Sequence, residues 1–281
     1  MKKLLLLLFL IPAIFIANSS FAEGYFDFDL VLSKARETNG VNLLLDNNKK
    51  GFISKAHAEK INDVRQKISA QAGIYPKFMI SSDMQSNAYA SAASGQGVIT
   101  ITYGLLQRIG TDYDALAAVI GHEFAHLTLD HSATQSSVNA IVDILGTIAL
   151  VAIDASWGGA QYNRHRELHK VGLNVGKSLS KAAYSRDDEY DADAKGVEYM
   201  LNSGYSIDGA FRMHNNIIPS NSGWFDTHPS SSNRVAYIQK TAEKFSHLVK
   251  RNNPSHKSHV KIARNEKQKG YRTGGGYVPS N

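Results

Sequence analysis

The sequence predicts an α+β protein that is mostly helical and contains a small sheet. Apolar residues recur at helical spacing over residues 26–72 and again over residues 177–202. Two shorter segments have the composition of strands, KFMISS at 77–82 and the alternating, β-branched VITITYG at 98–104. These elements fit one domain of residues 23–249, with segments of different character before and after it.

The first 22 residues are predicted to be a signal peptide that is removed from the mature protein. They begin with two lysines, continue with an apolar stretch at 4–16, and end in small residues around Phe21, so cleavage is expected after Ala22. An uncleaved membrane anchor is the alternative, but the apolar stretch is shorter than the ~20 residues that a spanning helix needs. We therefore expect an exported protein, with the bacterial periplasm favoured over attachment to the envelope or secretion.

Cysteine is absent from the chain. An exported protein of this composition folds without disulfides, so its core must be stable by itself. Any metal site must then be built from histidine and carboxylate ligands.

The net charge of +6 is unevenly distributed along the chain. Residues 250–281 hold eight Lys or Arg and one Glu, together with Asn, Ser and Gly and almost no apolar periodicity. Such a segment cannot bury enough apolar surface to fold, so we predict a disordered basic tail. This tail can contact a membrane surface or a polyanion, and a solvated terminus without a partner is the alternative. The domain before the tail is mildly acidic, and no nucleic-acid partner is expected.

The most hydrophobic segment after the signal peptide is VNAIVDILGTIALVAIDA at 138–155. Asp143 and Asp154 interrupt this segment, and it is shorter than a comfortable membrane span. We therefore predict a buried or surface-docked helix, and contact with a membrane remains the alternative.

Polar residues interrupt an apolar helical run in VIGHEFAHLTLDH at 119–131. His122 and His126 are four residues apart and lie on one face of the helix, where two imidazole nitrogens can bind one metal ion. Glu123 lies beside them and completes the H-E-x-x-H arrangement of zinc peptidases. A pair of hydrogen-bonded helix histidines without a metal is the alternative interpretation.

A third ligand does not follow at the spacing found in metzincins. The positions that hold Gly and His in that class hold Leu129 and Ser132 here, and His131 is one residue early. A carboxylate from a second helix can take this place, and SRDDEYDADAKG at 185–196 supplies candidates.

Glu189 and Asp193 in this segment are four residues apart and lie on one helical face. Glu189 can bind zinc, and Asp193 can accept a hydrogen bond from the non-ligating nitrogen of His122 or His126. Such a bond fixes the tautomer and orientation of the ring. A solvated acidic helix start is the alternative, because carboxylates are favourable at a helix N-terminus without any function.

Three motifs in order resemble the gluzincin family that includes the HtpX heat-shock protease, the CAAX prenyl protease and BepA-type periplasmic proteases. They are HEFAH, E-x-x-x-D within SRDDEYDADAKG, and THPSSSNR at 227–234. The resemblance extends from Asn87 to Ala242. It implies a zincin-like metallopeptidase fold with an active-site helix, a second ligand helix and a small sheet with a substrate-binding edge strand. Because a convincing series of membrane spans is missing, we expect a minimal soluble, exported member.

The resemblance also implies roles for individual residues. One zinc ion per chain is expected, with three protein ligands: His122, His126 and Glu189. Glu123 is the expected general base. His228 is expected to approach the metal, either as a fourth ligand at rest or as a donor to the transition state. Arg234 matches the arginine that follows this histidine in the family.

The expected reaction is hydrolysis of peptide bonds by metal-activated water, with Glu123 moving the proton. An extended substrate is expected to pair with an exposed edge formed by Val98, Ile99, Thr100 and Ile101, which suits unfolded or misassembled envelope proteins. Two other interpretations remain open. One is a zinc-containing, chaperone-like protein that binds clients with little turnover, and the other is a membrane-embedded protease.

Overall fold

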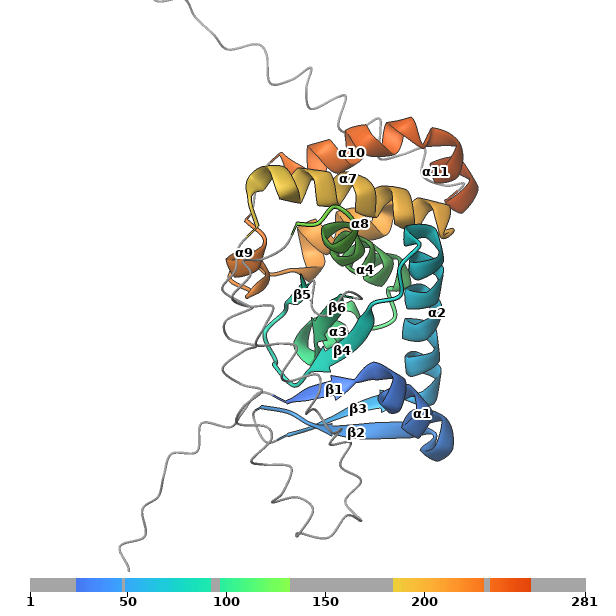
Figure 1. Cartoon of the computed structure of the whole chain (residues 1–281), viewed down its shortest axis with the longest axis vertical. Helices are drawn as coiled ribbons and strands as arrows, with labels where there is room; N and C mark the ends of the chain where they lie inside the picture. Colours follow the sequence, from blue (N-terminus) through green and yellow to red (C-terminus); the bar gives the residue numbers. More distant parts are fainter. Residues whose placement is uncertain (1–23, 47–48, 92–96, 132–183, 230–232, 254–281) are drawn as a thin grey trace, which may run out of the picture.

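The structure, a computed structural model, describes residues 24–46, 49–91, 97–131, 184–229 and 233–253 (Figure 1). The expected signal peptide, the apolar segment at 138–155 and most of the expected tail lie outside these residues. Among the helices that are described, none combines the length and the apolar composition needed to span a membrane.

The described residues form a four-stranded sheet, a separate two-stranded hairpin and a set of helices (Figure 1). The strands are β1 (Tyr25–Asp27), β2 (Gly40–Leu44), β3 (Lys50–Ser54), β4 (Lys77–Ser81), β5 (Ala88–Ser91) and β6 (Val98–Thr102). The helices are α1 (Phe28–Thr38), α2 (Lys55–Ala72), α3 (Tyr103–Ile109), α4 (Tyr113–Thr128), α7 (Arg186–Asn202), α8 (Asp208–Arg212), the π-helical η1 (Met213–Ile217), α9 (Trp224–Thr227), α10 (Arg234–Lys244) and α11 (Ser246–Asn252).

The helices gather mainly at one end of the molecule and the hairpin lies at the other. In Figure 1, α7 lies beside α4, α10 and α11 cover the outer side of α7, and α2 runs along the flank toward the hairpin. The four-stranded sheet lies between these ends in the order β1-β4-β6-β5. One apolar core joins the layers and includes Phe78 and Ile99 of the sheet with Leu116 and Phe124 of α4, all nearly fully buried. The predicted α+β, mostly helical class is confirmed.

The prediction of helix throughout residues 26–72 is confirmed for Phe28–Thr38 and Lys55–Ala72 but is wrong between them. Asn39, with φ 61°, ends α1, and the chain then forms the β2–β3 hairpin before α2 begins. In β2 the buried Val41 and Leu43 flank the exposed Asn42, which is the two-residue period of a half-buried strand. Such short apolar runs fit a helix or a strand equally well, and only the pairing with β3 decides between them.

Both predicted strands are present, but β6 is not an edge strand. It pairs in parallel with β4 on one side and antiparallel with β5 on the other, and all five of its residues are buried. The prediction that Val98–Ile101 offers an exposed edge to substrate is therefore wrong. Ala88–Ser91 form β5, and this strand occupies the edge in place of β6.

Side-chain caps define where α4 and α7, the helices that carry the H-E-x-x-H and acidic motifs, begin. The carboxylate of Asp112 accepts a hydrogen bond from the N–H of Ala115 (3.1 Å) at the start of α4. At the start of α7, the Ser185 hydroxyl accepts from the Asp188 N–H, and the Asp188 carboxylate accepts from the Ser185 N–H. This capping box satisfies two backbone donors and starts the helix that carries the acidic motif.

A pair of glycines brings α4 and α7 into backbone contact. A Cβ atom at Gly121 would lie 2.9 Å from the carbonyl oxygen of Gly196, and one at Gly196 would lie 2.8 Å from the backbone nitrogen of His122. Real Cβ contacts are not this short, so any side chain at either position pushes the two helices apart. The glycines therefore set the distance between the H-E-x-x-H helix and the helix that carries the acidic motif.

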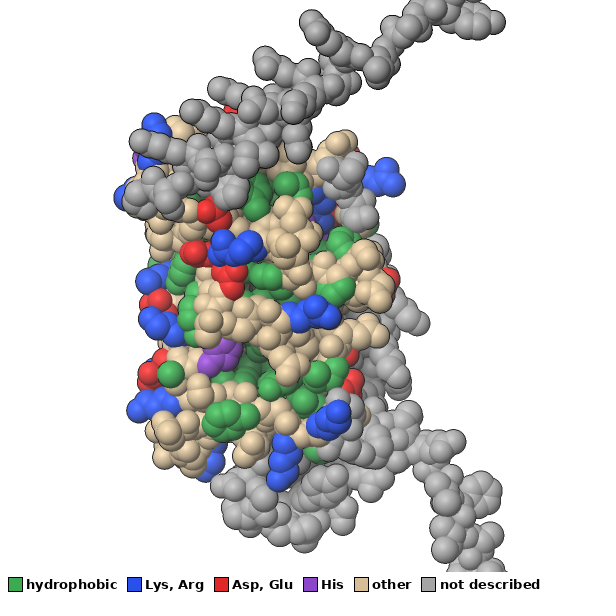
Figure 2. Space-filling model, turned by 180° about the vertical axis from the view of Figure 1, so that it is seen from behind, with side chains coloured by type: hydrophobic (Ala, Val, Ile, Leu, Met, Phe, Trp, Pro, Cys, Tyr) green, Lys and Arg blue, Asp and Glu red, His purple; other side chains and the backbone are tan. Residues whose placement is uncertain are grey.

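The last described helix, α11, runs three residues past the predicted domain boundary at residue 249. α11 continues to Asn252, whose side-chain amide donates to the carbonyl groups of Leu201 (2.7 Å) and Tyr205 (3.0 Å). The charge pattern started the tail too early because two basic residues belong to the last turn of α11. On the face of the domain shown in Figure 2, basic and acidic side chains are interspersed with apolar ones.

Replacing Gly196 with alanine should destabilise the domain despite the higher helix propensity of alanine. The added methyl group overlaps the backbone of α4, and such overpacking costs about 1–3 kcal/mol. Urea unfolding of Gly196→Ala should show a lower midpoint with an unchanged slope. Asp191→Ala, at an exposed position of the same helix, is the control and should stay within about 0.5 kcal/mol of the wild type. Equal stability of the two variants would contradict the close-contact interpretation.

Candidate active site

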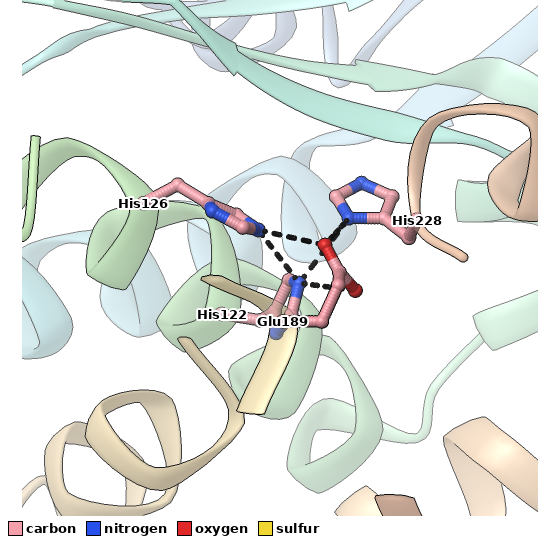
Figure 3. Close-up of side chains that lie close together, drawn as sticks. All are labelled: His122, His126, Glu189 and His228. Carbon is pink, nitrogen blue, oxygen red and sulfur yellow. Dashed lines mark hydrogen bonds and ion pairs between the residues drawn. The ribbon is translucent and has the colours of Figure 1, made fainter. Parts of the chain in front are cut away.

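Four side chains from three parts of the fold converge on one point. His122 and His126 come from α4, Glu189 comes from α7, and His228 follows α9 (Figure 3). One donor atom from each residue lies within 4.8 Å of all the others, and all four side chains are buried. We call these residues the donor cluster.

The spacing and chemistry of the donor cluster fit a zinc ion. The Nε2 atoms of His122 and His126 are 3.0 Å apart, and Nδ1 of His228 lies 3.3 Å from Nε2 of His122. Oε1 of Glu189 lies 2.9 Å from Nδ1 of His228 and 3.3 Å from Nε2 of His126. Ligand atoms at the corners of a tetrahedron with zinc bonds of about 2.0–2.1 Å are separated by roughly 3.3 Å. Three imidazoles and one carboxylate are also common zinc ligands.

Asp193 and Arg234 lie behind the donor cluster. Oδ1 of Asp193 lies 3.1 Å from Nδ1 of His122, the ring nitrogen that points away from the cluster. Arg234 donates two hydrogen bonds of 2.7 Å to the Asp193 carboxylate, and its third nitrogen lies 2.5 Å from Oε2 of Glu189. The arginine therefore links the carboxylate that orients a ring to the carboxylate in the cluster.

These contacts keep both carboxylates ionised. Burial alone would raise the pKa of Asp193, but the hydrogen bonds and charge of Arg234, together with His122, hold it well below its ordinary range. Burial alone would also raise the pKa of Glu189. The charges of His228 and His122 outweigh this effect and lower its pKa far below the ordinary value. A carboxylate that is fully ionised is ready to bind a cation.

Glu123 has the environment of a buried base. Its side chain has no exposed surface, and neither carboxylate oxygen has a hydrogen-bond partner among the described residues. Its Oε1 lies 3.4 Å from Nε2 of His228. Burial raises the pKa of Glu123, and the charges of His228 and His122 only partly offset that rise. Such a carboxylate has spare acceptor capacity and a high affinity for a proton.

A second histidine orients His126 from the side away from the cluster. Nδ1 of His126 lies 3.1 Å from Nδ1 of His131, and Nε2 of His131 lies 3.8 Å from Oδ1 of Asp188. If Nε2 of His126 binds a metal, its Nδ1 carries the proton and donates it to the lone pair of His131. The proton of His131 then sits on Nε2 and faces Asp188. In the sequence, His131 was notable only as a histidine one residue short of a ligand position, and its spacing gave no sign of this supporting contact.

Two aromatic rings that no motif indicated enclose the cluster. The ring of Tyr184 stacks on His126 with centroids 3.6 Å apart and planes 12° apart, and Trp224 stacks on His228 at 4.2 Å and 25°. Both aromatic residues are buried. The sequence could have indicated these two residues only by their proximity to the motifs. Tyr184 directly precedes the acidic motif, and Trp224 lies four residues before His228.

His214 is a further buried histidine near the site. It comes from η1, and its Nε2 lies 3.9 Å from Oδ1 of Asp193, at a small cavity that His122 also lines. Burial lowers the pKa of His214 to about 4, so the ring is neutral at neutral pH. No spacing in the sequence connected this residue to the motifs.

Comparison with known proteins identifies the family. The model of peptidase family M48 matches residues 55–242, a range that contains the complete donor cluster. The chain belongs to peptidase family M48. It is therefore a zinc metallopeptidase, and the donor cluster is the place among the described residues where one metal ion can be held.

Several relatives have names that agree with this assignment. The "Protease HtpX homolog" of Salinibacter ruber is 27% identical over 218 residues, which cover 68% of this chain and 77% of that protein. The "Protease HtpX homolog" of Campylobacter curvus is 25% identical over 224 residues, covering 67% and 76%. Bovine "Metalloendopeptidase OMA1, mitochondrial" is 27% identical over 155 residues, covering 51% of this chain but 28% of that protein. The chain is thus similar to proteins named as proteases, and the bovine metalloendopeptidase among them is much longer in sequence.

His131→Leu should weaken zinc binding by roughly 10- to 100-fold, the usual cost of losing a contact that orients a metal-binding histidine. His131→Gln, whose amide oxygen can still accept from Nδ1 of His126, should recover part of this loss. Zinc affinity is measured by competition with a fluorescent chelator. His57→Gln is the control, because His57 makes one polar contact with the Tyr113 hydroxyl (3.1 Å) in another part of the fold. Unchanged affinity in His131→Leu would show that His131 does not orient His126.

Proposed function

We propose that this M48 peptidase is an endopeptidase that hydrolyses unfolded or misassembled proteins outside the cytoplasm. The observation that carries the proposal is Glu123, a fully buried carboxylate without a hydrogen-bond partner among the described residues, placed directly beside the donor cluster. A buried, unpartnered carboxylate is costly in a folded protein. A proton-transfer role explains why the site would retain it.

In this proposal the zinc ligands are His122, His126 and Glu189. Zinc held there would polarise the scissile carbonyl group and lower the pKa of water toward ~7. Asp193 and Arg234 hold the ring of His122 and the carboxylate of Glu189 in place, so that the ligands are fixed before the ion binds.

Glu123 is the proposed general base. Its raised pKa favours uptake of the proton from water as oxygen attacks the carbonyl carbon. The same carboxyl group then delivers the proton to the amide nitrogen, and the carbon–nitrogen bond breaks with an amine as the leaving group. Full burial keeps bulk water from competing for the proton during these steps.

His228 has two proposed roles, and each of its two ring nitrogens serves one of them. Nδ1 belongs to the donor cluster, so the ring can complete the ligand set at rest. Nε2 lies 3.1 Å from the carbonyl oxygen of Ala88 and 3.4 Å from Glu123. If the ring leaves the cluster when substrate enters, it can donate a hydrogen bond to the developing oxyanion.

The proposed binding mode for substrate is addition of an extended strand to β5. This strand is the sheet edge beside the donor cluster, since His228 contacts its first residue. Backbone pairing reads the main chain more than the side chains, which suits unfolded polypeptides as the substrate class.

The proposed location rests on the composition of the two ends of the chain. The lysine-initiated apolar stretch before Ala22 supports export, with the periplasm as the compartment. The basic residues after Asn253 support an electrostatic contact with an anionic membrane surface or a polyanion. Both parts of the proposal concern where the enzyme works and leave the chemistry of the site unchanged.

A zinc-containing, chaperone-like binding protein with little turnover is the second candidate function. The observation that favours it is the number of donors, because four protein ligands are typical of structural zinc sites rather than catalytic ones. Glu123 distinguishes the two candidates, since a binding protein has no need of a buried base.

Glu123→Gln should retain zinc and the fold but lose proteolysis by roughly 100- to 10,000-fold, because only the proton transfer is removed. Cleavage of unfolded casein is measured with and without a chelator, and zinc content is measured on the same samples. Glu198→Gln, a partly exposed position on α7, is the matched control and should cleave normally. Normal cleavage by Glu123→Gln would remove this residue from the mechanism. An inactive wild type that binds casein would instead favour the binding-protein function.

His228→Ala should retain zinc and lose roughly 100- to 1000-fold in casein cleavage, the cost of removing one donor to an oxyanion. The loss is expected in kcat rather than in KM, because the bond forms only in the transition state. A rise in cleavage would instead show that the ring only blocks the ion at rest. Unchanged cleavage together with unchanged zinc affinity would remove His228 from both roles.

A further inference from the structure

Among the described residues, no strand pairs with the side of β5 that faces away from β6, and two of its carbonyl groups face that side. Its pairing with β6 begins where the backbone N–H of Thr102 donates to the carbonyl oxygen of Asn87 (2.9 Å). Inward and outward groups alternate along an antiparallel strand, so the next carbonyl groups that face away from β6 are those of Ala88 and Ala90. A strand that adds to this edge would donate its N–H groups to these two oxygens.

Both carbonyl groups already accept hydrogen bonds from side chains of the active site. The Tyr184 hydroxyl donates to the carbonyl oxygen of Ala90 at 2.9 Å, and both residues are buried. Nε2 of His228 lies 3.1 Å from the carbonyl oxygen of Ala88. The open edge of the sheet is therefore closed by two side chains that belong to different segments of the chain.

The two segments are also joined to each other and to the donor cluster. The backbone N–H of Tyr184 donates to the carbonyl oxygen of Thr227 (3.0 Å), the residue before His228. The Thr227 hydroxyl donates to the side chain of Asn87 (3.2 Å) at the start of β5. Tyr184 also stacks on His126, so one residue spans the distance from the cluster to the strand edge.

We propose that Tyr184 competes with the substrate backbone for the carbonyl group of Ala90 and so sets the affinity of this peptidase for extended chains. The proposal rests on the proposed function, in which β5 receives the substrate. A substrate strand on this side of β5 would place its N–H where the Tyr184 hydroxyl now meets the carbonyl oxygen of Ala90, so the hydroxyl must withdraw and the hydrogen bond gained is offset by the one lost. The hydrogen bond from substrate to Ala90 therefore adds little net binding free energy. The affinity for substrate must come from the other backbone contacts along the strand.

Replacement of the Tyr184 hydroxyl by a substrate N–H favours chain segments whose backbone groups are available for hydrogen bonding over several residues. A folded protein with a short exposed segment displaces the hydroxyl without forming a compensating ladder of backbone bonds. An unfolded chain forms the whole ladder, because its other N–H and C=O groups are available. Tyr184 is therefore assigned as a specificity residue for unfolded backbone, distinct from the residues that carry out the chemistry.

Tyr184→Phe tests the proposal, because it removes the hydroxyl and keeps the ring that stacks on His126. Binding is measured by fluorescence anisotropy in the Glu123→Gln variant, with a labelled peptide that spans one casein site cleaved by the wild type. The peptide should bind roughly 2- to 10-fold more tightly to the Tyr184→Phe protein, the value of one net hydrogen bond. Tyr199→Phe is the matched control, since it removes a hydroxyl that donates to Thr128 (3.0 Å) away from the edge. Its peptide affinity should be unchanged.

A second probe shows whether the gain comes from backbone pairing. The same peptide with alternate amides N-methylated cannot donate to the strand edge, so Tyr184→Phe should no longer improve its binding. Equal zinc content and circular dichroism spectra establish that both variants are folded. Cleavage of casein by the wild type together with unchanged or weaker peptide binding by Tyr184→Phe would overturn this proposal and leave the proposed function standing. Absence of both cleavage and binding in the wild type would overturn the two together.

Discussion

The backbone contact between α4 and α7 at Gly121 and Gly196 is the constraint on which the rest of the active site depends. His122 directly follows the first glycine, and Asp193 lies one turn before the second. A side chain at either glycine would increase the separation of the helices, and Nε2 of His126 on α4, now 3.3 Å from Oε1 of Glu189 on α7, would no longer meet it. The precision of the site is thus a property of two rigid helices rather than of a loop.

Charge compensation makes this close packing tolerable. Two carboxylates one turn apart on a buried helix face would repel each other and lose hydration. Arg234 pairs with both, through two hydrogen bonds to Asp193 and an ion pair with Glu189, and it is itself almost completely buried. One guanidinium group therefore neutralises part of the site permanently, and a divalent cation would neutralise the remainder.

The sequence was most informative where chemistry depends on spacing along one helix. The i,i+4 pairs of α4 and α7 could be predicted because a helix places such residues on one face whatever surrounds it. Tyr184, Trp224 and the true edge strand could not be predicted, because their roles arise from contacts between distant segments. AYAS in β5 illustrates the limit, since three of its four residues, two alanines and a serine, have little strand propensity, and the segment forms a strand by pairing with β6. The β2–β3 hairpin was missed for a different reason, because its short apolar runs fit a helix as well as a strand.

The donor cluster also connects parts of the chain that are far apart in sequence. Its members come from α4, α7 and the segment after α9, and the chain has no cysteine to link them covalently. A bound zinc ion would act as a cross-link that closes the long loops between these segments and restricts the unfolded ensemble. The free energy of metal binding then becomes part of the free energy of folding. The supply of zinc would therefore govern the lifetime of the folded state as well as the rate of peptide-bond hydrolysis.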